Sequence, residues 1–260
     1  MRRDNLFWGL ALILLGVLLY LQAQGIINNL FQYIWPLAMI LVGAWFILSV
    51  YWRPAPTSSE TFSIPLGPVQ SVSYRFAHGA GQLDISGGAP DGQAIVGTSA
   101  AGMNKSSRVD GDQLEVRVEA GPSFIPFLGP SEGVWRFQIA QDVPVRLTVE
   151  SGASYQNIDL RDVLATRLNL KTGASSTNVT MPARGTSRLD VEAGASTINI
   201  VVPGSTAGRI QVEEGVTAVD VDTDRFPLLH TGLYQSIDFD TAADRTEIQI
   251  ESGLGKVTVR

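Results

Sequence analysis

The chain has 260 residues, a formal net charge of −6 and no cysteine. The acidic balance, with only three lysines, argues against nucleic-acid binding, because phosphate contacts need clustered Lys and Arg, and against a soluble domain lying on anionic lipid. The absence of cysteine excludes disulfides, thiolate metal sites and thiol nucleophiles.

Two uncharged apolar runs open the chain, at residues 6–21 and 30–52. A membrane span needs about 20 apolar residues, which the second run exceeds and the first approaches. Residues 22–29 between them contain Gly25 and two asparagines, which favour a turn. We therefore predict a two-helix transmembrane hairpin over residues 1–52.

The basic residues near the hairpin predict its orientation. Arg2 and Arg3 precede the first run, Arg53 follows the second, and the connection has no Lys or Arg. The positive-inside rule then puts both termini in the cytoplasm. The alternative for the first run is a cleaved signal peptide, with Arg2 and Arg3 as its basic region.

An internal repeat dominates the rest of the chain. Residues 53–60 contain two prolines and small polar residues, which predict a linker, and residues 61–260 are predicted to form a β domain. Four similar segments start at a constant interval of about 21 residues, a fifth starts after a longer interval, and a weaker copy covers residues 74–85. The five clear copies begin at Leu147, Leu168, Leu189, Ile210 and Ile248.

Within each copy, apolar and polar residues alternate with a period of two, which is typical of half-buried strands. Two short strands and two corners per copy predict one coil of a β-solenoid, whose coils bury a core only by stacking. The first residues of the copies should then form an internal ladder in chain order. The expected outward rows are Glu150, Lys171 and Glu192, with alternating charge, and Asn157, Asn178 and Asn199, continued by Asp220.

A glycine recurs at one position of the repeat, followed by small residues that suit a tight corner between closely stacked coils. The glycines are Gly79 in the weak copy and Gly152, Gly173, Gly194, Gly215 and Gly253 in the clear ones. A positive φ is the expected reason for glycine at position 173.

Residues 86–142 interrupt the repeat. Segments 114–120 and 134–140 alternate and are predicted strands. Between them, residues 121–133 form a proline-rich loop that either caps the open solenoid end or contacts a membrane or partner. Its apolar residues are Phe124, Ile125, Phe127 and Leu128.

The sequence predicts no catalytic, cofactor-binding or metal-binding residues. His78 and His230 are isolated from each other and from other ligand types. Asp220, Asp222 and Asp224 alternate toward one side, which is expected to be a solvated acidic face because no calcium-loop pattern accompanies them. A carbohydrate-active solenoid enzyme is the weaker alternative.

The segment LFWGLALILLGVLLYLQAQGII…FQYIWPLAMILVGAWFIL resembles the transmembrane hairpin of bacterial LiaI/LiaF-type proteins. The β domain resembles the toast-rack or LiaF C-terminal domain and related adhesin-like domains. The carriers are FAHGAGQLDISGG, VWRFQIAQDVPVRLTVESGAS, the repeated GAS turns and YQSIDFDTAADRTEIQIESGLGKVTV.

The resemblance implies a non-enzymatic, multi-pass protein of the bacterial inner membrane, of the cell-envelope stress type, in which LiaF-like members restrain a sensor kinase. The expected partners are the lipid bilayer, a membrane or cytoplasmic protein such as a sensor kinase, and another copy of the chain. The alternative is an envelope-facing structural or adhesin-like module that binds cell-wall material.

Overall fold

A computed structural model describes residues 24–25, 39, 60–99, 103–120, 133–213 and 216–260. The chain divides into two compact units, Met1–Ala55 and Pro56–Arg260. Gln24 and Gly25 form a turn, and Gly25 has a positive φ of 74°. Apart from these two residues and Met39, the predicted hairpin (1–52) lies outside the described residues, as do the linker up to residue 59 and most of the 121–133 loop.

The described residues include no helix with the length and apolar character that a membrane span requires. They form fourteen strands in one sheet. The strands are β1 (Glu60–Pro65), β2 (Ser71–Gly87), β3 (Gln93–Ser99), β4 (Met103–Asp110), β5 (Gln113–Ala120), β6 (Gly133–Ile139), β7 (Val145–Asp159), β8 (Ala165–Thr180), β9 (Thr186–Val201), β10 (Ala207–Val212), β11 (Val216–Val221), β12 (Leu228–His230), β13 (Leu233–Gln235) and β14 (Arg245–Val259).

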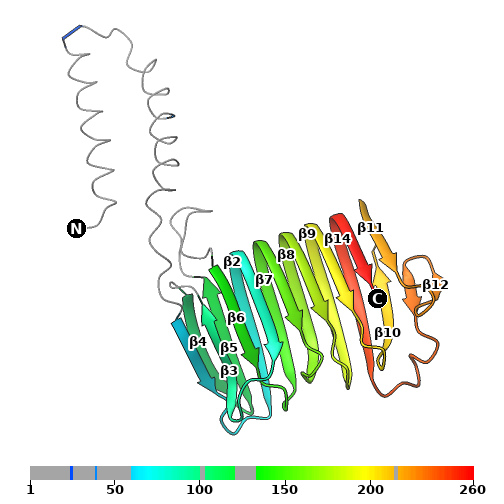
Figure 1. The fold of residues 1–260 in the computed structure, drawn as a ribbon, viewed down its shortest axis with the longest axis horizontal. Coiled ribbons are helices and arrows are strands. Elements are labelled where there is room, and N and C mark those ends of the chain that lie inside the picture. Colours follow the sequence, from blue (N-terminus) through cyan, green and yellow to red (C-terminus); the bar gives the residue numbers. More distant parts are fainter. Residues whose placement is uncertain (1–23, 26–38, 40–59, 100–102, 121–132, 214–215) are drawn as a thin grey trace. The chain divides into compact units, whose positions relative to one another are not determined.

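The sheet folds over on itself into two layers (Figure 1). The first halves of the five long strands pair with each other, and their second halves do the same. Layer A contains β4, β5, the first halves of β2, β7, β8, β9 and β14, and then β10, β13 and β12. Layer B contains β1, β3, β6, the second halves of the same five strands, and β11.

Each long strand bends where the repeat has its glycine. In β7 the buried positions have odd numbers before Gly152 and even numbers after it, so the chain turns a corner there while it keeps one side toward the core. Contacts between the layers close the core, because Phe76 of layer A stacks on Phe137 of layer B with ring centroids 4.9 Å apart. The fold is the predicted β-solenoid, in which each coil is one bent strand and a return turn.

The repeated apolar positions form the expected internal ladders. Leu147, Leu168 and Leu189 pair in register and are at most 1% exposed. The predicted strands at 114–120 and 134–140 are confirmed as β5 and β6, which form a further coil on the other side of β2.

The order of the last coils differs from the expected one. Ile248 pairs with Leu189 on one side and with Ile210 on the other, so β14 lies between β9 and the β10–β11 coil. Insertion of β14 also interrupts the predicted row of Asn199 and Asp220, because Thr258 stands between them. A repeat places side chains within a coil, but coils of equal shape can stack in more than one order.

The repeated glycines are required for a different reason from the one expected. Gly173 is absent from the described glycines with positive φ, so the expectation of a left-handed corner was wrong. A Cβ at Gly173 would lie 2.9 Å from the carbonyl oxygen of Gly152, and a Cβ at Gly194 would lie 2.9 Å from that of Gly173. Close approach of neighbouring backbones therefore excludes a side chain at this edge, which we call the glycine edge.

The segment after β11 packs against the start of β10 at the C-terminal end of the stack. Phe226 is fully buried, and its ring occupies the space that a side chain at Gly208 would need. Arg225 donates hydrogen bonds from its guanidinium to the carbonyl oxygens of Val202, Pro203 and Thr206. Burial lowers the pKa of Arg225. Its hydrogen bonds hold the segment after β11 against residues 202–206.

Candidate functional site

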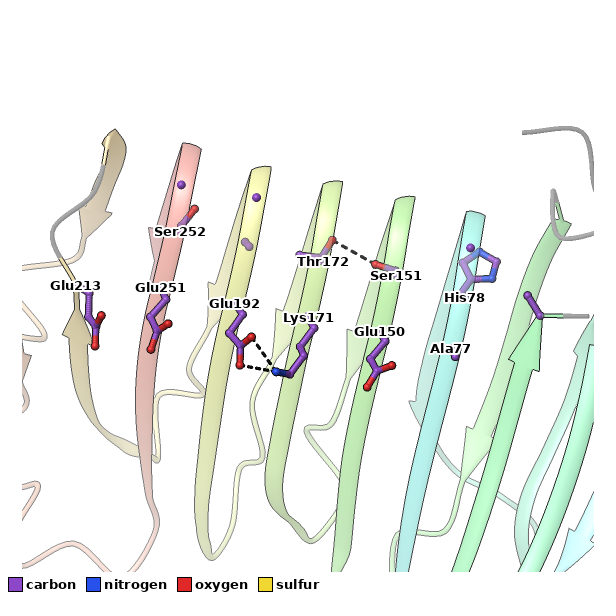
Figure 2. Close-up of a pocket in the computed structure, with 15 residues that line it drawn as sticks. Ala77, His78, Glu150, Ser151, Lys171, Thr172, Glu192, Glu213, Glu251 and Ser252 are labelled. Atoms are coloured by element: carbon purple, nitrogen blue, oxygen red, sulfur yellow. Dashed lines mark hydrogen bonds and ion pairs between the residues drawn. The ribbon is translucent and has the colours of Figure 1, made fainter. Parts of the chain in front are cut away.

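A groove lies on layer A, next to the glycine edge. It has a volume of about 1010 Å³ and crosses β2, β7, β8, β9, β14 and β10. Figure 2 shows one ionisable side chain from each of the last five strands pointing outward in a row. The row, in spatial order, is Glu150, Lys171, Glu192, Glu251 and Glu213.

The fourth position of the repeat determines the charge of this row. Glu150, Lys171 and Glu192 pair in register, as predicted, and alternate in sign. Insertion of β14 then places Glu251 directly beside Glu192, and Glu213 follows on β10. Neighbouring positions are about 4.8 Å apart, so three carboxylates of like charge are adjacent, an arrangement that costs stability.

Cations compensate only one end of the row. Lys171 donates to both carboxylate oxygens of Glu192 at 2.7 and 2.8 Å, and Arg75 pairs with Glu150 at 2.8 Å. The hydrogen bond to Glu192 raises the pKa of Lys171. Within the described part of the chain, neither Glu213 nor Glu251 forms an ion pair, and Glu213 accepts only a long hydrogen bond of 3.4 Å from Gln249.

Glu213 and Glu251 were not singled out from the sequence, although a signal was present. Both occupy the fourth position of their repeat copies, as Glu150, Lys171 and Glu192 do. What the repeat did not predict was their order, because the insertion of β14 puts Glu251, and not Glu213, beside Glu192.

The floor of the groove is made by small residues near the bends. Ser151 and Thr172 hydrogen-bond through their hydroxyls at 3.2 Å. Gln156 is fully buried behind this edge and donates to Ser151 and Ser154. These hydrogen bonds connect buried and half-buried polar side chains on both sides of the bend in β7.

His78 lies at the β2 end of the groove and is 2% exposed. Its ring packs on Trp135 with centroids 4.5 Å apart, and neither ring nitrogen has a hydrogen-bond partner among the described residues. Burial lowers the pKa of His78 to about 4, so the ring is neutral near pH 7. His230 is exposed in β12, and the structure does not bring the two histidines into one site.

The three aspartates flagged in the sequence do not form one face. β11 ends at Val221, so only Asp220 belongs to the strand. Asp220 pairs with Arg260 at 2.7 Å, and this hydrogen bond lowers its pKa. Asp222 instead accepts backbone N–H groups of the following turn, from Asp224 and Arg225. No group of three or more potential metal ligands occurs in the described residues.

The outer face of layer B carries uncharged polar side chains that pair in register. The predicted asparagine row is present, since Asn157, Asn178 and Asn199 pair in register. Asn199 donates to the side-chain oxygen of Asn178 at 2.9 Å, and Asn178 donates to the hydroxyl of Tyr155 at 3.0 Å. These bonds join three coils side by side on a flat surface.

A second, smaller cleft of about 400 Å³ lies toward the opposite edge of layer A. Its arginines are already engaged in holding neighbouring segments. Arg188 pairs with Asp190 and Glu247, while Arg209 pairs with Asp240 and lies over the ring of Phe239 at 4.2 Å. This cleft therefore anchors the 236–244 connection to the sheet.

Family models match two parts of the chain. The model described as the N-terminal domain of toast_rack, DUF2154, matches residues 53–201, and the LiaI-LiaF-like transmembrane region matches residues 6–47. Both agree with the resemblances found in the sequence. No curated protein matches the chain.

One solved structure shares the fold of the β domain. A candidate cell adhesion protein from Clostridium sporogenes ATCC 15579 has a TM-score of 0.71 at 17% identity, covering 78% of this chain and 98% of its own. A candidate adhesin from Bacteroides fragilis NCTC 9343 covers 80% of this chain and 100% of its own at 9% identity, but its TM-score of 0.28 is too low to inform the fold.

Proposed function

Because the chain belongs to the toast-rack family, matched over residues 53–201, we propose that it is a non-enzymatic regulator of the cell-envelope stress type. In this proposal the N-terminal hairpin anchors the protein in the bacterial inner membrane. The solenoid lies in the cytoplasm and binds a protein partner, such as a membrane-bound sensor kinase, through its outer surface.

The observation that carries the proposal is the combination of the two matches in one chain. The LiaI-LiaF-like transmembrane match ends at residue 47 and the toast-rack match begins at residue 53. A membrane anchor joined closely to a rigid solenoid keeps a broad protein-binding surface near the membrane. The positions of Arg2, Arg3 and Arg53 favour the cytoplasmic side.

The chemistry of the described surface is consistent with binding rather than catalysis. The groove on layer A offers a row of exposed ionisable side chains on a stiff sheet, which suits electrostatic selection of a partner. His78 is the one strongly shifted imidazole among the described residues, and it is enclosed against Trp135.

A topology experiment tests the orientation. Reporters that are active only outside or only inside the cell are fused after Arg260 of the full chain. Inside-only activity is expected and directs the partner search to cytoplasmic domains of membrane kinases. Outside-only activity would overturn the cytoplasmic assignment.

A charge-reversal experiment tests the regulatory role. Glu213→Lys together with Glu251→Lys should change the output of an envelope-stress reporter in cells, because the variant removes the acidic half of the groove. The matched control is Asp91→Lys with Asp162→Lys, which changes the charge equally at two exposed positions outside the groove. An identical response of the two double variants, at equal membrane levels, would contradict a role for the groove.

The second candidate is an envelope-facing, adhesin-like module. It is favoured by the shared fold with the candidate cell adhesion protein from Clostridium sporogenes. The flat polar face of layer B, with its asparagine row, would then be the surface toward cell-wall material. Outside-only activity in the topology experiment would make this candidate the leading one.

A further inference from the structure

The two layers stop at different strands at the C-terminal end of the stack. Among the described strands, β11 pairs only with β14, so layer B ends at β11. Layer A continues beyond β10 to β13 and β12. Two strands of layer A therefore extend past the last strand of layer B.

One apolar row shows the consequence of this step. Ile210 pairs with Tyr234, and Tyr234 pairs with Leu228, so the three side chains share the core-facing side of layer A. Ile210 is fully buried, Tyr234 is partly buried, and Leu228 is 55% exposed. Leu228 thus has the orientation of a core residue but lacks a covering layer.

The edge of β11 presents backbone groups beside this uncovered row. The N–H of Asp222 donates to the carbonyl oxygen of Val259, so the even-numbered residues of β11 face β14. Because successive residues alternate, Thr217, Val219 and Val221 direct their N–H and C=O groups away from β14. The strand has no Pro or Lys of the kind that protects natural sheet edges.

We propose that this edge binds an extended protein segment with alternating apolar and basic residues, which adds to layer B beside β11 as a further strand. Its backbone would pair with the outward groups of β11, and its apolar side chains would cover Tyr234 and Leu228. The inference rests on the proposed function as an interaction module, and it names one surface and the chemistry of the partner.

Acidic residues near the edge favour basic residues in the partner segment. Asp222 and Asp224 follow β11 directly, and neither forms an ion pair among the described residues. Asp220, on the outer face of β11, already has Arg260 and Lys256 beside it. Asp222 is engaged by two backbone N–H groups of its own turn and by Arg225, so the exposed Asp224 is the carboxylate that basic side chains of an added strand would meet.

The test uses the full chain in nanodiscs of uncharged phosphatidylcholine, so that lipid does not attract the probe. The probe is a labelled synthetic peptide of six residues, the length of β11, in which valine and lysine alternate. A peptide of alternating valine and glutamate is the control for charge. We expect the lysine peptide alone to bind and to slow amide hydrogen exchange at Val219 and Val221 by at least about tenfold.

Two variants locate the binding. Leu228→Glu should weaken the affinity by about tenfold or more, because it places a charge in the row to be covered. Ile237→Glu is the matched control, since Ile237 is 95% exposed and belongs to no strand. Both positions are more than half exposed, so both variants should fold, as unchanged thermal unfolding would verify.

Binding that is insensitive to Leu228→Glu, or that leaves the β11 amides unprotected, would overturn the proposal. Protection of these amides without peptide, together with a doubled particle mass, would show that the edge binds a second copy of the chain. The proposal of a separate partner segment would then be wrong. If the peptide binds as expected while the stress reporter ignores the groove variants, the docking site stands and the proposed role of the groove fails.

Discussion

The central coils and the C-terminal end of the solenoid use the same repeat in different ways. In the coils of β7, β8 and β9, chain order and spatial order agree, and equivalent residues of successive copies pair in register. At the C-terminal end, β14 enters between β9 and the coil made before it. In this protein the repeat predicts the shape of each coil, but it does not predict the order in which the last coils stack.

Deletion of residues 245–260, which removes β14 and Arg260, should have the largest effect on stability. The reason is that β14 lies between the central coils and the C-terminal coil. β14 buries four aliphatic side chains completely, and each contributes about 1.5–3 kcal/mol. The total of about 6–12 kcal/mol is comparable with the whole stability of a domain. These side chains are Ile248, Ile250, Val257 and Val259.

Limited proteolysis and thermal unfolding of the truncated chain would measure this effect. We expect early cleavage after residue 205, where the orphaned β10–β13 segment begins. A truncated chain that unfolds like the full one would show that β14 is not an internal strand.

Gly173→Val tests the regular region alone. Its Cβ would meet the backbone oxygen of Gly152 at 2.9 Å, so the coils must separate. We expect a loss of about 3 kcal/mol in the free energy of unfolding, measured by urea titration. Gly204→Val is the matched control, because a Cβ there meets nothing within 4 Å. Equal losses in the two variants would contradict close approach as the cause.

His78 tests the coil in which the repeat is least regular. It holds the place that Ser151, Thr172 and Ala193 hold in the central coils. Its pKa falls from 6.5 to about 4 on folding, so the unfolded chain binds more protons between these values. Stability is therefore expected to fall by about 2 kcal/mol as the pH drops from 6.5 to 4, and to level off below that.

The measurement is the free energy of unfolding as a function of pH, for the natural chain and for His78→Phe. The variant keeps an aromatic ring against Trp135 and has no group to titrate. The free energy of unfolding of His78→Phe should depend less on pH between 6.5 and 4 than that of the natural chain. Parallel curves for the two proteins would assign the slope to other groups.

Lys171 is the only cation in the groove row, and Lys171→Met should have the smallest effect on stability. The Lys171 and Glu192 side chains are 51% and 55% exposed, so solvent screens their pair. We expect no measurable change in urea unfolding at physiological salt. A clear loss would mean that the pair helps to hold β8 and β9 together.

The sequence predicted the features that depend on local periodicity. Alternation placed Leu147, Leu168 and Leu189 in the core, and the constant interval between copies paired Glu150 with Lys171. Both follow from strand geometry, in which side chains alternate and equivalent positions of stacked coils coincide.

Features that depend on contacts between distant segments were not predictable in this way. Glu251, and not Glu213, lies beside Glu192, although Glu251 and Glu192 are far apart in the chain. The glycines were predicted at the correct positions with the wrong cause, because close approach of Gly173 to Gly152 is a property of the stack. The exposed Leu228 likewise results from layers of unequal extent, which no local pattern records.

The most direct test of the account is disulfide formation, which the absence of natural cysteines makes unambiguous. Asn199 pairs with Thr258, whereas Asp220 lies one strand further away. Cysteines at 199 and 258 should cross-link under mild oxidation, since neighbouring strands bring Cα atoms within the range that a disulfide spans, and cysteines at 199 and 220 should not. Efficient cross-linking of 199 with 220, and none of 199 with 258, would restore chain order and remove the exposed β11 edge on which the proposed docking site depends.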